Sequence, residues 1–278
     1  MTMAVKRGLS VVMMGRDEER FLPLSLPPLF QVADEVIFVD TGSKDRTLTL
    51  VRDLGCQVFQ QPWQSDFSAP KNYGLRKAGF SWILNVDCDE VLQNPEKVRR
   101  WLHALPIDDP TPAYIIGIDN LLADGNTYPM DALRFFRNDP RIQFFNPIHE
   151  GVADSIYRAW PDTPLPKGEI RLLHYGYQAG INQEKIARNI EILRQWVHSE
   201  PNTLYGTFKL GSNLCHRGEI EEGLFFLARA FSLLDEQENR GSYPFGQQLI
   251  NEYCKQLIQT GQNQQAQQVK ERVDSWSN

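Results

Sequence analysis

The sequence predicts an α/β domain with a mixed β-sheet, followed by a region of α-helices. Strand-like and helix-like segments alternate over about the first hundred residues. From Pro106 onward, short strand-like runs are separated by loops rich in Pro, Asp and Asn, and after Tyr177 the apolar spacing becomes helical. Because each of these patterns indicates a different packing arrangement, we expect two domains, residues 1–180 and residues 181–278.

The first part of the chain alternates four short apolar runs with helices. Runs rich in β-branched and aromatic residues indicate buried strands, and they cover residues 9–14, 35–39, 57–60 and 82–86. Helices are expected over residues 17–26, 46–54, 68–79 and 94–105, and Pro27-Pro28 is expected to end the first of them. This alternation predicts a parallel sheet with right-handed crossovers.

The rest of the chain predicts three further strands and then helices. The strands are expected over residues 113–122, 133–137 and 170–173, and the helices over residues 182–197, 204–217, 220–234, 245–260 and 263–276. Glycine-containing turns at Gly218 and Gly261 divide the last four helices into two similar pairs, which resemble a tetratricopeptide repeat. A helical cap on the first domain is the alternative.

Bulk properties exclude several classes of protein. A net charge of -6 argues against non-specific nucleic-acid binding. No apolar run approaches the roughly 18 residues that span a bilayer. The four cysteines have no metal-type spacing and fit reduced thiols, so a cytoplasmic protein is expected.

The strand over residues 82–86 ends in a cluster of carboxylates, Asp87-Cys88-Asp89-Glu90. Desolvated carboxylates cost several kcal/mol unless they are paired or bind a metal, and ligands bind at the carboxyl ends of strands in open α/β sheets. Asp87 and Asp89 therefore predict a divalent-cation site beside a phosphate-bearing substrate. An exposed acidic turn that caps a helix is the alternative.

Two other strand ends carry acidic residues. Asp40 ends the second strand and precedes Thr41-Gly42-Ser43, where a carboxylate could accept hydrogen bonds from a base. Glu18 follows the first strand within Arg16-Asp17-Glu18-Glu19. The alternatives are a capped turn at Asp40 and a charged helix start at Glu18.

Four motifs in order resemble a family 2 glycosyltransferase of the GT-A fold: LSVVMMGRDEERFL, DEVIFVDTGSKDRTLTL, WQSDFSAPKNYGL and SWILNVDCDEVL. The resemblance implies a nucleotide-sugar donor, usually a UDP-sugar, and a Mn²⁺ or Mg²⁺ ion. It implies that Glu18 and Asp40 hold the base and ribose, that Asp87 contacts the ribose or the metal, and that Asp89 binds the metal. Lys71, within Ala69-Pro70-Lys71-Asn72, would approach the donor.

Two later motifs, Leu133-Arg-Phe-Phe-Arg-Asn138 and Asn146-Pro-Ile-His-Glu-Gly151, resemble the subgroup of this family that carries helical repeats or acts on lipopolysaccharide core sugars. An inverting transfer needs one base to accept the proton of the acceptor hydroxyl. Glu150 is the first candidate for this base and Asp131 the second. A pair of surface-loop residues is the alternative for His149-Glu150.

His174 follows the last predicted strand, where a neutral imidazole could complete the metal coordination; a buried structural histidine is the alternative.

The Gln-x-x-Arg-Trp motif of processive polymer synthases is missing, which predicts the transfer of a single sugar. The acceptor would be a glycan, a lipid-linked molecule or a protein, and the helical region could contact a partner or a second copy of the chain.

Two other functions fit parts of this pattern. Asp87-x-Asp89-x-Val91 also satisfies a phosphatase pattern in which the first Asp is the nucleophile. A transferase-like domain without activity, which uses its helical repeats as a binding scaffold, is the other alternative.

Overall fold

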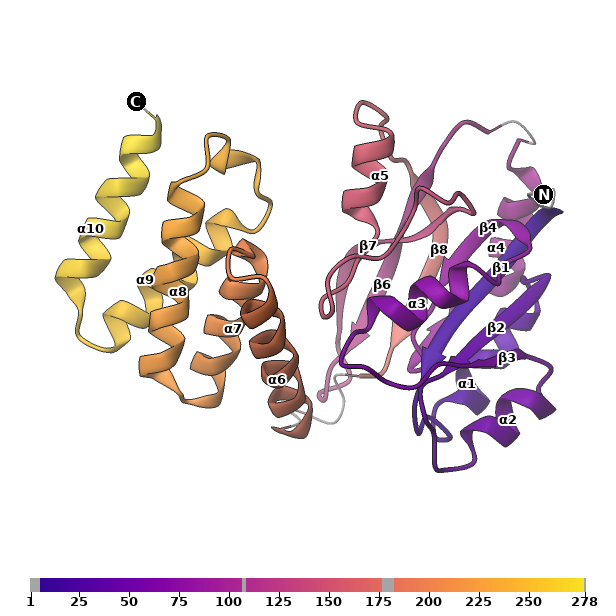
Figure 1. The fold of residues 1–278 in the computed structure, drawn as a ribbon. Helices are drawn as coiled ribbons and strands as arrows, with labels where there is room; N and C mark the ends of the chain where they lie inside the picture. Colours follow the sequence, from indigo (N-terminus) through magenta and orange to yellow (C-terminus); the bar gives the residue numbers. More distant parts are fainter. Residues whose placement is uncertain (1–5, 107–108, 177–182, 278) are drawn as a thin grey trace. The chain divides into compact units, whose positions relative to one another are not determined.

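The protein is an α/β domain followed by helices, as the sequence predicts (Figure 1). The computed structural model describes residues 6–106, 109–176 and 183–277. The chain forms two compact units, Met1–Ile181 and Asn182–Asn278. Each unit has its own hydrophobic core.

The first unit is built on one eight-stranded mixed sheet with the strand order β3-β2-β1-β4-β7-β6-β8-β5. The strands are β1 (Lys6–Gly15), β2 (Glu35–Asp40), β3 (Gln57–Gln60), β4 (Phe80–Asn85), β5 (Glu90–Leu92), β6 (Ala113–Leu121), β7 (Thr127–Arg137) and β8 (Lys167–His174).

Strands β3, β2, β1 and β4 run parallel, which confirms the parallel sheet expected from the alternating pattern. Gly15 at the end of β1 is in register with Asp40 at the end of β2. Parallel strands present their carboxyl ends at one edge of a sheet. The loops after β1, β2 and β4 therefore meet at that edge.

The other half of the sheet is mostly antiparallel. Strand β7 pairs antiparallel with both β4 and β6, while β6 and β8 run parallel. The short strand β5, which follows the carboxylate cluster, pairs antiparallel with β8 and places Glu90 opposite His174. This pairing brings the end of β8 to the same edge as the end of β4.

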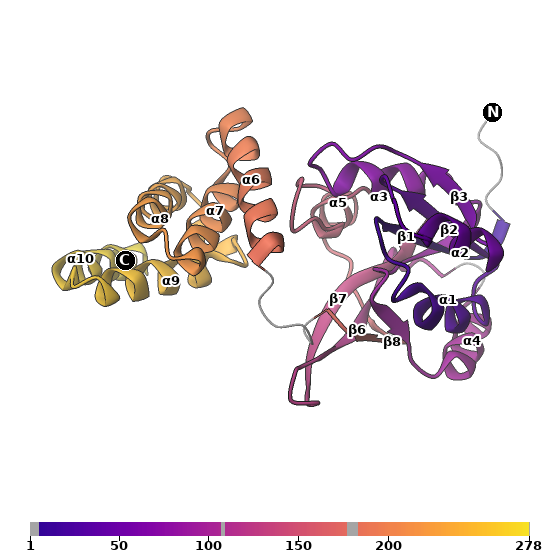
Figure 2. The ribbon, with the colours of Figure 1, turned by 90° about the horizontal axis from the view of Figure 1, so that it is seen from below.

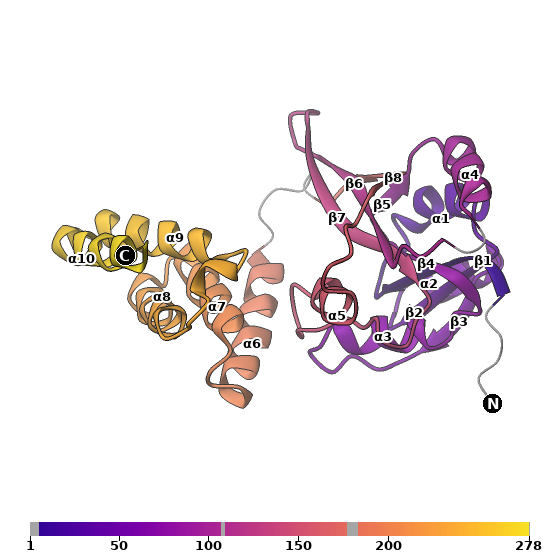
Figure 3. The ribbon, with the colours of Figure 1, turned by 90° about the horizontal axis from the view of Figure 1, so that it is seen from above.

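Helices cover both faces of the sheet (Figures 2 and 3). Side chains alternate between the faces of a strand: Leu9, Val11 and Met13 of β1 pack with α1 (Leu22–Phe30), α2 (Thr47–Asp53) and α4 (Pro95–Ala104). On the opposite face, Val12 packs with α3 (Ser68–Leu75) and α5 (Ala153–Ala159).

Helix α1 differs from the prediction, because Pro27 and Pro28 lie inside the helix and do not end it. Proline removes a backbone hydrogen bond and normally breaks a helix. Here Leu22, Leu26 and Leu29 are fully buried against the sheet. This tertiary packing outweighs the missing bonds, and the helix continues to Phe30.

The second unit consists of α6 (Gln183–Ser199), α7 (Leu204–Arg217), α8 (Ile220–Asp235), α9 (Gly246–Gln259) and α10 (Asn263–Asp274), with short 3₁₀ helices at Arg240–Ser242 and Ser275–Ser277. The predicted turns are present, and Gly218 and Gly261 adopt positive φ angles of 92° and 77°. The expected cap at Asn182 lies outside the described residues. Of the helices in the described parts of the chain, none has the length and apolar character to cross a membrane.

Candidate active site

The turn after β4 holds its carboxylates through its own backbone. The backbone N–H of Asp87 donates to Oε2 of Glu90 (2.8 Å), and the N–H of Glu90 donates to the carbonyl of Asp87 (3.1 Å). Cys88 points into the core and donates to the carbonyl of Met14. The turn is therefore fixed against β1, and the carboxylates of Asp87 and Asp89 stay partly exposed, at 36% and 19% of their side-chain surface.

Asp87 lies between two cations. Its Oδ1 is 3.2 Å from Nζ of Lys71, and its Oδ2 is 2.9 Å from a guanidinium nitrogen of Arg134. Burial disfavours the Asp87 carboxylate, but Arg134 and Lys71 outweigh it and hold the pKa of Asp87 well below its usual range. Asp87 is therefore charged in the folded protein.

Glu90 is almost completely buried, at 1% exposure, and also contacts Arg134 at 3.3 Å. Burial raises the pKa of Glu90 to about 7, and the nearby Arg134 opposes that rise. A carboxylate in this position serves to hold Asp87 and Arg134 in place.

Lys71 joins the β4 turn to the loop that carries Glu150. Its Nζ is 2.6 Å from Oε1 of Glu150, and Lys71 itself is 4% exposed. Burial disfavours the ammonium, yet the charges of Asp87 and Glu150 raise the pKa of Lys71 above its usual value. The lysine thus remains protonated and fixes both carboxylates.

The next residue of α3 anchors the same loop. The Asn72 amide donates to the carbonyl of Phe144 (2.9 Å) and accepts from the N–H of Phe144 (2.8 Å). Phe145 and Gly151 form an isolated β-bridge that closes the loop. The Lys71-Asn72 dipeptide therefore holds both ends of the segment that presents Glu150.

Asp89 and His174 come together across the β5–β8 pairing. Nε2 of His174 is 3.4 Å from Oδ2 of Asp89, and its Nδ1 is 2.8 Å from Oδ1 of Asn120. The Asn120 amide nitrogen donates to the carbonyl of Tyr128, which fixes Oδ1 toward the imidazole. Nδ1 of His174 thus faces Asn120 and Nε2 faces Asp89. Burial disfavours the charged imidazole, but the hydrogen bond and the charge of Asp89 outweigh it and raise the pKa of His174 above its usual value.

The space in front of this pair is kept clear by Gly176. A Cβ atom on Gly176 would collide with Nε2 of His174 and would lie 2.8 Å from Oδ2 of Asp89. No group of three metal-ligating side chains converges within residues 6–106, 109–176 and 183–277. The pair fits a divalent cation that takes its remaining ligands from substrate phosphates and water, as Mg²⁺ commonly does.

The other two strand ends supply Glu18 and Asp40. A Cβ atom on Gly15 would lie 2.9 Å from Cγ of Glu18 and 2.7 Å from Sγ of Cys88, so Glu18 reaches over β1 toward the β4 turn. Asp40 is 1% exposed and accepts from the N–H groups of Gly42 and Ser43, both at 3.1 Å. Asp40 thus caps its own turn, as the alternative interpretation of the sequence predicts, and it lies at the sheet edge where β1 also ends.

Asp131 lies apart from this cluster. It is exposed on β7 and forms an ion pair with Lys167 of β8 at 2.7 Å. The structure therefore joins Lys71, Asp87 and Glu150 by direct contacts, and Asp89 with His174 by another, but it places Asp131 in a surface ion pair.

The sequence analysis gave no role to three residues of the site, Asn72, Asn120 and Arg134, and named Glu90 only as a member of the carboxylate cluster. Asn72 directly follows Lys71 in the sequence, and this position next to a predicted site residue was the available signal. Arg134 and Asn120 come from strands far along the chain, and they enter the site only through the pairing of β7, β6 and β8.

The strand order and the acidic residues at the ends of β1, β2 and β4 fit the GT-A type of α/β domain. The model of glycosyl transferase family 2 matches residues 10–149, half of the chain. The chain therefore belongs to that family.

Individual relatives agree with this assignment. The chain is 32% identical over 227 residues to a TPR repeat-containing protein of Synechococcus elongatus, covering 78% of this chain and 55% of that protein. It is 26% identical over 234 residues to the SPbeta prophage-derived glycosyltransferase SunS of Bacillus subtilis, covering 80% of this chain and 48% of SunS. The chain thus spans about half the length of these curated relatives.

Among solved structures, residues 1–349 of S. aureus TarS in complex with UDP-GlcNAc are similar, with a TM-score of 0.52 and 13% identity. The match covers 92% of each chain. At this identity the likeness supports the fold.

Proposed function

We propose that the chain transfers one sugar from a UDP-sugar to an acceptor hydroxyl, with inversion at the anomeric carbon and with Mn²⁺ or Mg²⁺ bound. The contact between Asp89 and His174, beside the charged cluster of Lys71, Asp87 and Glu150, carries this proposal. The complex of TarS with UDP-GlcNAc supports the choice of a UDP-sugar.

Asp89 and His174 are the residues that would hold the cation. A metal-bound histidine usually donates its second ring N–H to an oxygen acceptor, and Asn120 provides that acceptor for His174. When bound, the cation would neutralise charge on the leaving diphosphate. The residues present therefore fit a divalent ion.

Glu18 and Asp40 are proposed to line the base and ribose end of the donor site. Asp40 accepts two backbone hydrogen bonds, yet a carboxylate has about four lone-pair sites, so it can accept further bonds from a base. Asp87 is proposed to face the ribose from the next strand end, where Lys71 and Arg134 orient it.

Glu150 is proposed as the base. The acceptor oxygen forms a bond to the anomeric carbon, the bond between that carbon and the diphosphate oxygen breaks, and the acceptor proton moves to Glu150. Lys71 contacts Oε1 of Glu150 at 2.6 Å, and the second carboxylate oxygen is the one proposed to accept the proton. Asp131, paired with Lys167, remains the second candidate.

The identity of the acceptor, the cytoplasmic location and a partner or homodimer contact through the helices stay predictions. We propose that the helical unit, residues 181–278, contributes a tetratricopeptide-like surface for a glycan, lipid-linked or protein acceptor. The similarity to a TPR repeat-containing protein supports this choice.

The test is metal-dependent nucleotide binding. Calorimetry of UDP with Mn²⁺ should give saturable binding to the wild type, and Asp89→Ala should abolish the metal-dependent part. Asp124→Ala, which removes an exposed carboxylate from the β6–β7 turn, serves as the matched control and should bind normally. Unchanged UDP and Mn²⁺ binding in Asp89→Ala would show that Asp89 is not a metal ligand.

A further inference from the structure

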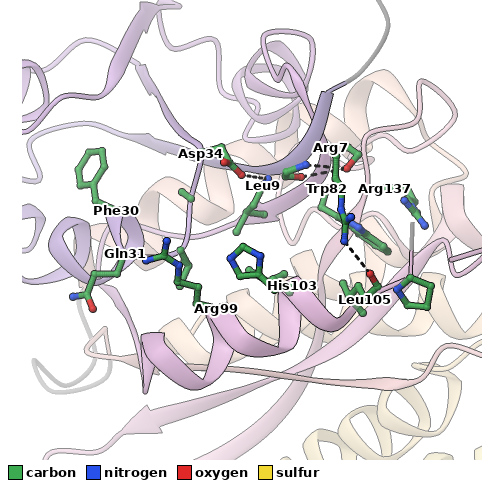
Figure 4. Close-up of a pocket in the computed structure, with 16 residues that line it drawn as sticks. Arg7, Leu9, Phe30, Gln31, Asp34, Trp82, Arg99, His103, Leu105 and Arg137 are labelled. Atoms are coloured by element: carbon green, nitrogen blue, oxygen red, sulfur yellow. Dashed lines mark hydrogen bonds between the residues drawn. The ribbon is translucent and has the colours of Figure 1, made fainter. Parts of the chain in front are cut away.

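A second pocket lies at the opposite edge of the sheet, at the amino ends of β1 and β4 (Figure 4). Its volume is about 460 Å³, within the range of roughly 300–1,000 Å³ that small-molecule sites occupy. The walls come from the start of β1, the end of α1, the start of β4, the end of α4 and the end of β7.

Cationic side chains dominate the polar lining. Arg7, Arg99 and Arg137 come from three different elements, and among the lining residues that the structure describes Asp34 is the one acidic side chain. Over the described ranges 6–106, 109–176 and 183–277, none of these arginines has an ion pair with a carboxylate. In a chain of net charge -6, this pocket is a local positive region.

Two of the arginines are oriented by neutral groups. Arg7 donates to the carbonyl of Leu105 at 3.2 Å. Arg137 donates to the carbonyls of Asp109 and Thr111, and its guanidinium lies 4.0 Å from the centre of the Trp82 ring. Backbone carbonyls position a guanidinium without cancelling its charge, so both groups can still bind an anion.

Asp34 does not neutralise the pocket. Its Oδ2 accepts the backbone N–H of Leu9 at 2.8 Å, and this bond fastens the start of β1 (Figure 4). The Asp34 carboxylate thus holds the backbone of β1, and within the described ranges it forms no ion pair with the arginines.

The remaining lining is apolar. Phe30 and Val32 at the end of α1, Leu102 of α4 and Trp82 of β4 line the pocket, and the imidazole of His103 points toward β1 (Figure 4). A pocket that combines apolar walls with a few convergent polar groups orients a ligand that has both kinds of surface.

This pocket is distinct from the proposed donor site. Gly8 lines the pocket, whereas Gly15, at the other end of the same strand, lies beside Glu18. Gly8 and Gly15 are seven steps apart along the strand, which is roughly 23 Å at the usual rise per residue.

We propose that this pocket is a second ligand site, which binds a small organic oxyanion: a phosphate or carboxylate attached to an apolar body. The oxyanion contacts Arg99 at the rim, and Arg7 and Arg137 add positive charge around it. The apolar body packs between Phe30, Leu102 and Trp82.

Phenyl phosphate is the probe, and amide resonances of Gly8, Val32 and Ala33 report its binding in a protein–NMR titration. Three comparison ligands separate the parts of the probe. Inorganic phosphate has the charge without the apolar body, and benzyl alcohol has the apolar body without the charge. Benzoate replaces the phosphate group by a carboxylate. Arg99→Gln removes one pocket cation; Arg100→Gln, on the same helix and outside the lining, is the matched control.

Phenyl phosphate should shift the three amides saturably, and more tightly than phosphate or benzyl alcohol. Arg99→Gln should weaken its binding by about tenfold, the effect of losing one charge-assisted hydrogen bond, while Arg100→Gln should leave it unchanged. The exposed positions of both arginines keep the fold intact.

Three outcomes would overturn the proposal. The first is no saturable chemical-shift change at these amides up to about 10 mM phenyl phosphate, which is the limit for a weak ligand. The others are an equal loss of phenyl phosphate affinity in Arg99→Gln and Arg100→Gln, or chemical-shift changes confined to the loops after β1, β2 and β4. Each of these outcomes leaves the transferase proposal standing, because UDP and Mn²⁺ binding is read at the other edge of the sheet.

Discussion

Lys71 is the residue on which the geometry of the site depends. Its ammonium contacts Asp87 at 3.2 Å and Glu150 at 2.6 Å, and these two carboxylates come from segments far apart in the chain. Removing one member of a buried ion pair leaves an uncompensated charge, which costs about 3–5 kcal/mol. The lysine is therefore a positioning residue that fixes the distance between Asp87 and Glu150.

Replacing the proposed base should separate catalysis from binding. Glu150→Gln keeps the shape and a hydrogen-bond acceptor for Lys71 but cannot take the acceptor proton. Turnover on a competent acceptor should fall by about 10²–10⁴-fold while the affinity for the UDP-sugar changes little. Steady-state kinetics and calorimetry measure the two quantities.

Asp131→Asn is the matched comparison for that variant. Asp131 lies in a surface ion pair with Lys167, so this change should leave turnover close to that of the wild type. The reverse result, with a large loss in Asp131→Asn and near-normal turnover in Glu150→Gln, would transfer the role of base to Asp131.

Single residues of the site were predictable where a charged side chain directly follows a buried strand. Asp87 and Asp89 follow an apolar strand directly, and such carboxylates need partners. Their partners were less visible. Asn120 appears in the sequence as an ordinary polar residue of a strand, and only the pairing of β6 with β8 places it against His174.

At the scale of single elements, β7 contains an irregularity at Arg134. Tyr114 pairs with Phe135 and Ile115 pairs with Leu133, so Arg134 is an extra residue without a partner on β6. A β-bulge of this kind re-aims a side chain and is common beside active sites. Here it directs the guanidinium of Arg134 to Asp87 and Glu90.

Removing that guanidinium should destabilise the first unit. Arg134→Ala leaves Glu90 buried without its cation, and the free energy of unfolding should fall by about 3 kcal/mol. Without Arg134 the already raised pKa of Glu90 rises further and the carboxyl group is protonated at neutral pH, so adding Glu90→Gln should change the free energy of unfolding little. Urea unfolding of the single and double variants measures both effects.

Arg141→Ala provides the control for the loss of an arginine. Arg141 is exposed and pairs with Asp139 at 2.8 Å, and surface pairs contribute about 0–1 kcal/mol. If Arg141→Ala and Arg134→Ala destabilised the protein equally, the buried cluster would not have the structural importance assigned to it.

In the helical unit, Asp235 ties α8 to the end of the chain. Its Oδ1 accepts from Nε1 of Trp276 (2.7 Å) and Nε of Arg272 (2.9 Å). Burial opposes the charged form, but these hydrogen bonds together with the charge of Arg272 lower the pKa of Asp235 below 3.8. Asp235→Asn should therefore cost about 1–2 kcal/mol at neutral pH.

The pH dependence of that cost follows from linkage. A carboxyl group with a lowered pKa in the folded state contributes stability above its unfolded pKa, and this contribution is lost as pH falls through the folded pKa. The difference between wild type and Asp235→Asn should be constant above about pH 5 and shrink below about pH 4. Hydrogen exchange of the α10 amides measures it, and a difference that grew toward low pH would contradict the assignment.

Element boundaries were predicted well where turns carry glycine or where apolar runs are short. The predicted segments 204–217 and 57–60 coincide with α7 and β3. Helix α1 and the β7 bulge were not predictable in the same way. Sequence rules end a helix at Pro27-Pro28, whereas in the structure the burial of three leucines against the sheet extends α1 to Phe30. The bulge in β7 is not visible in the sequence, because the alternation of apolar and polar residues gives no signal for one extra residue.

The whole molecule has separate hydrophobic cores in its two units. We therefore expect two heat-unfolding transitions in calorimetry. UDP with Mn²⁺ at 100 times the dissociation constant should stabilise the first unit by about 2.7 kcal/mol and raise its midpoint by roughly 5–10 °C. The midpoint of the second unit should stay in place, and a single transition that shifts as a whole would contradict independent unfolding.

The fastening of the segment from Phe144 to Gly151 has a practical consequence for protein engineering. The Asn72 side chain forms hydrogen bonds with the backbone of Phe144 at one end, and Lys71 forms an ion pair with Glu150 near the other end. The β-bridge between Phe145 and Gly151 joins the two ends. Exposed side chains of the segment, such as His149, can therefore be varied while its backbone frame is retained. If the chain transfers a sugar as proposed, a library that varies these exposed positions and keeps Lys71, Asn72 and Glu150 should yield variants with a changed acceptor preference.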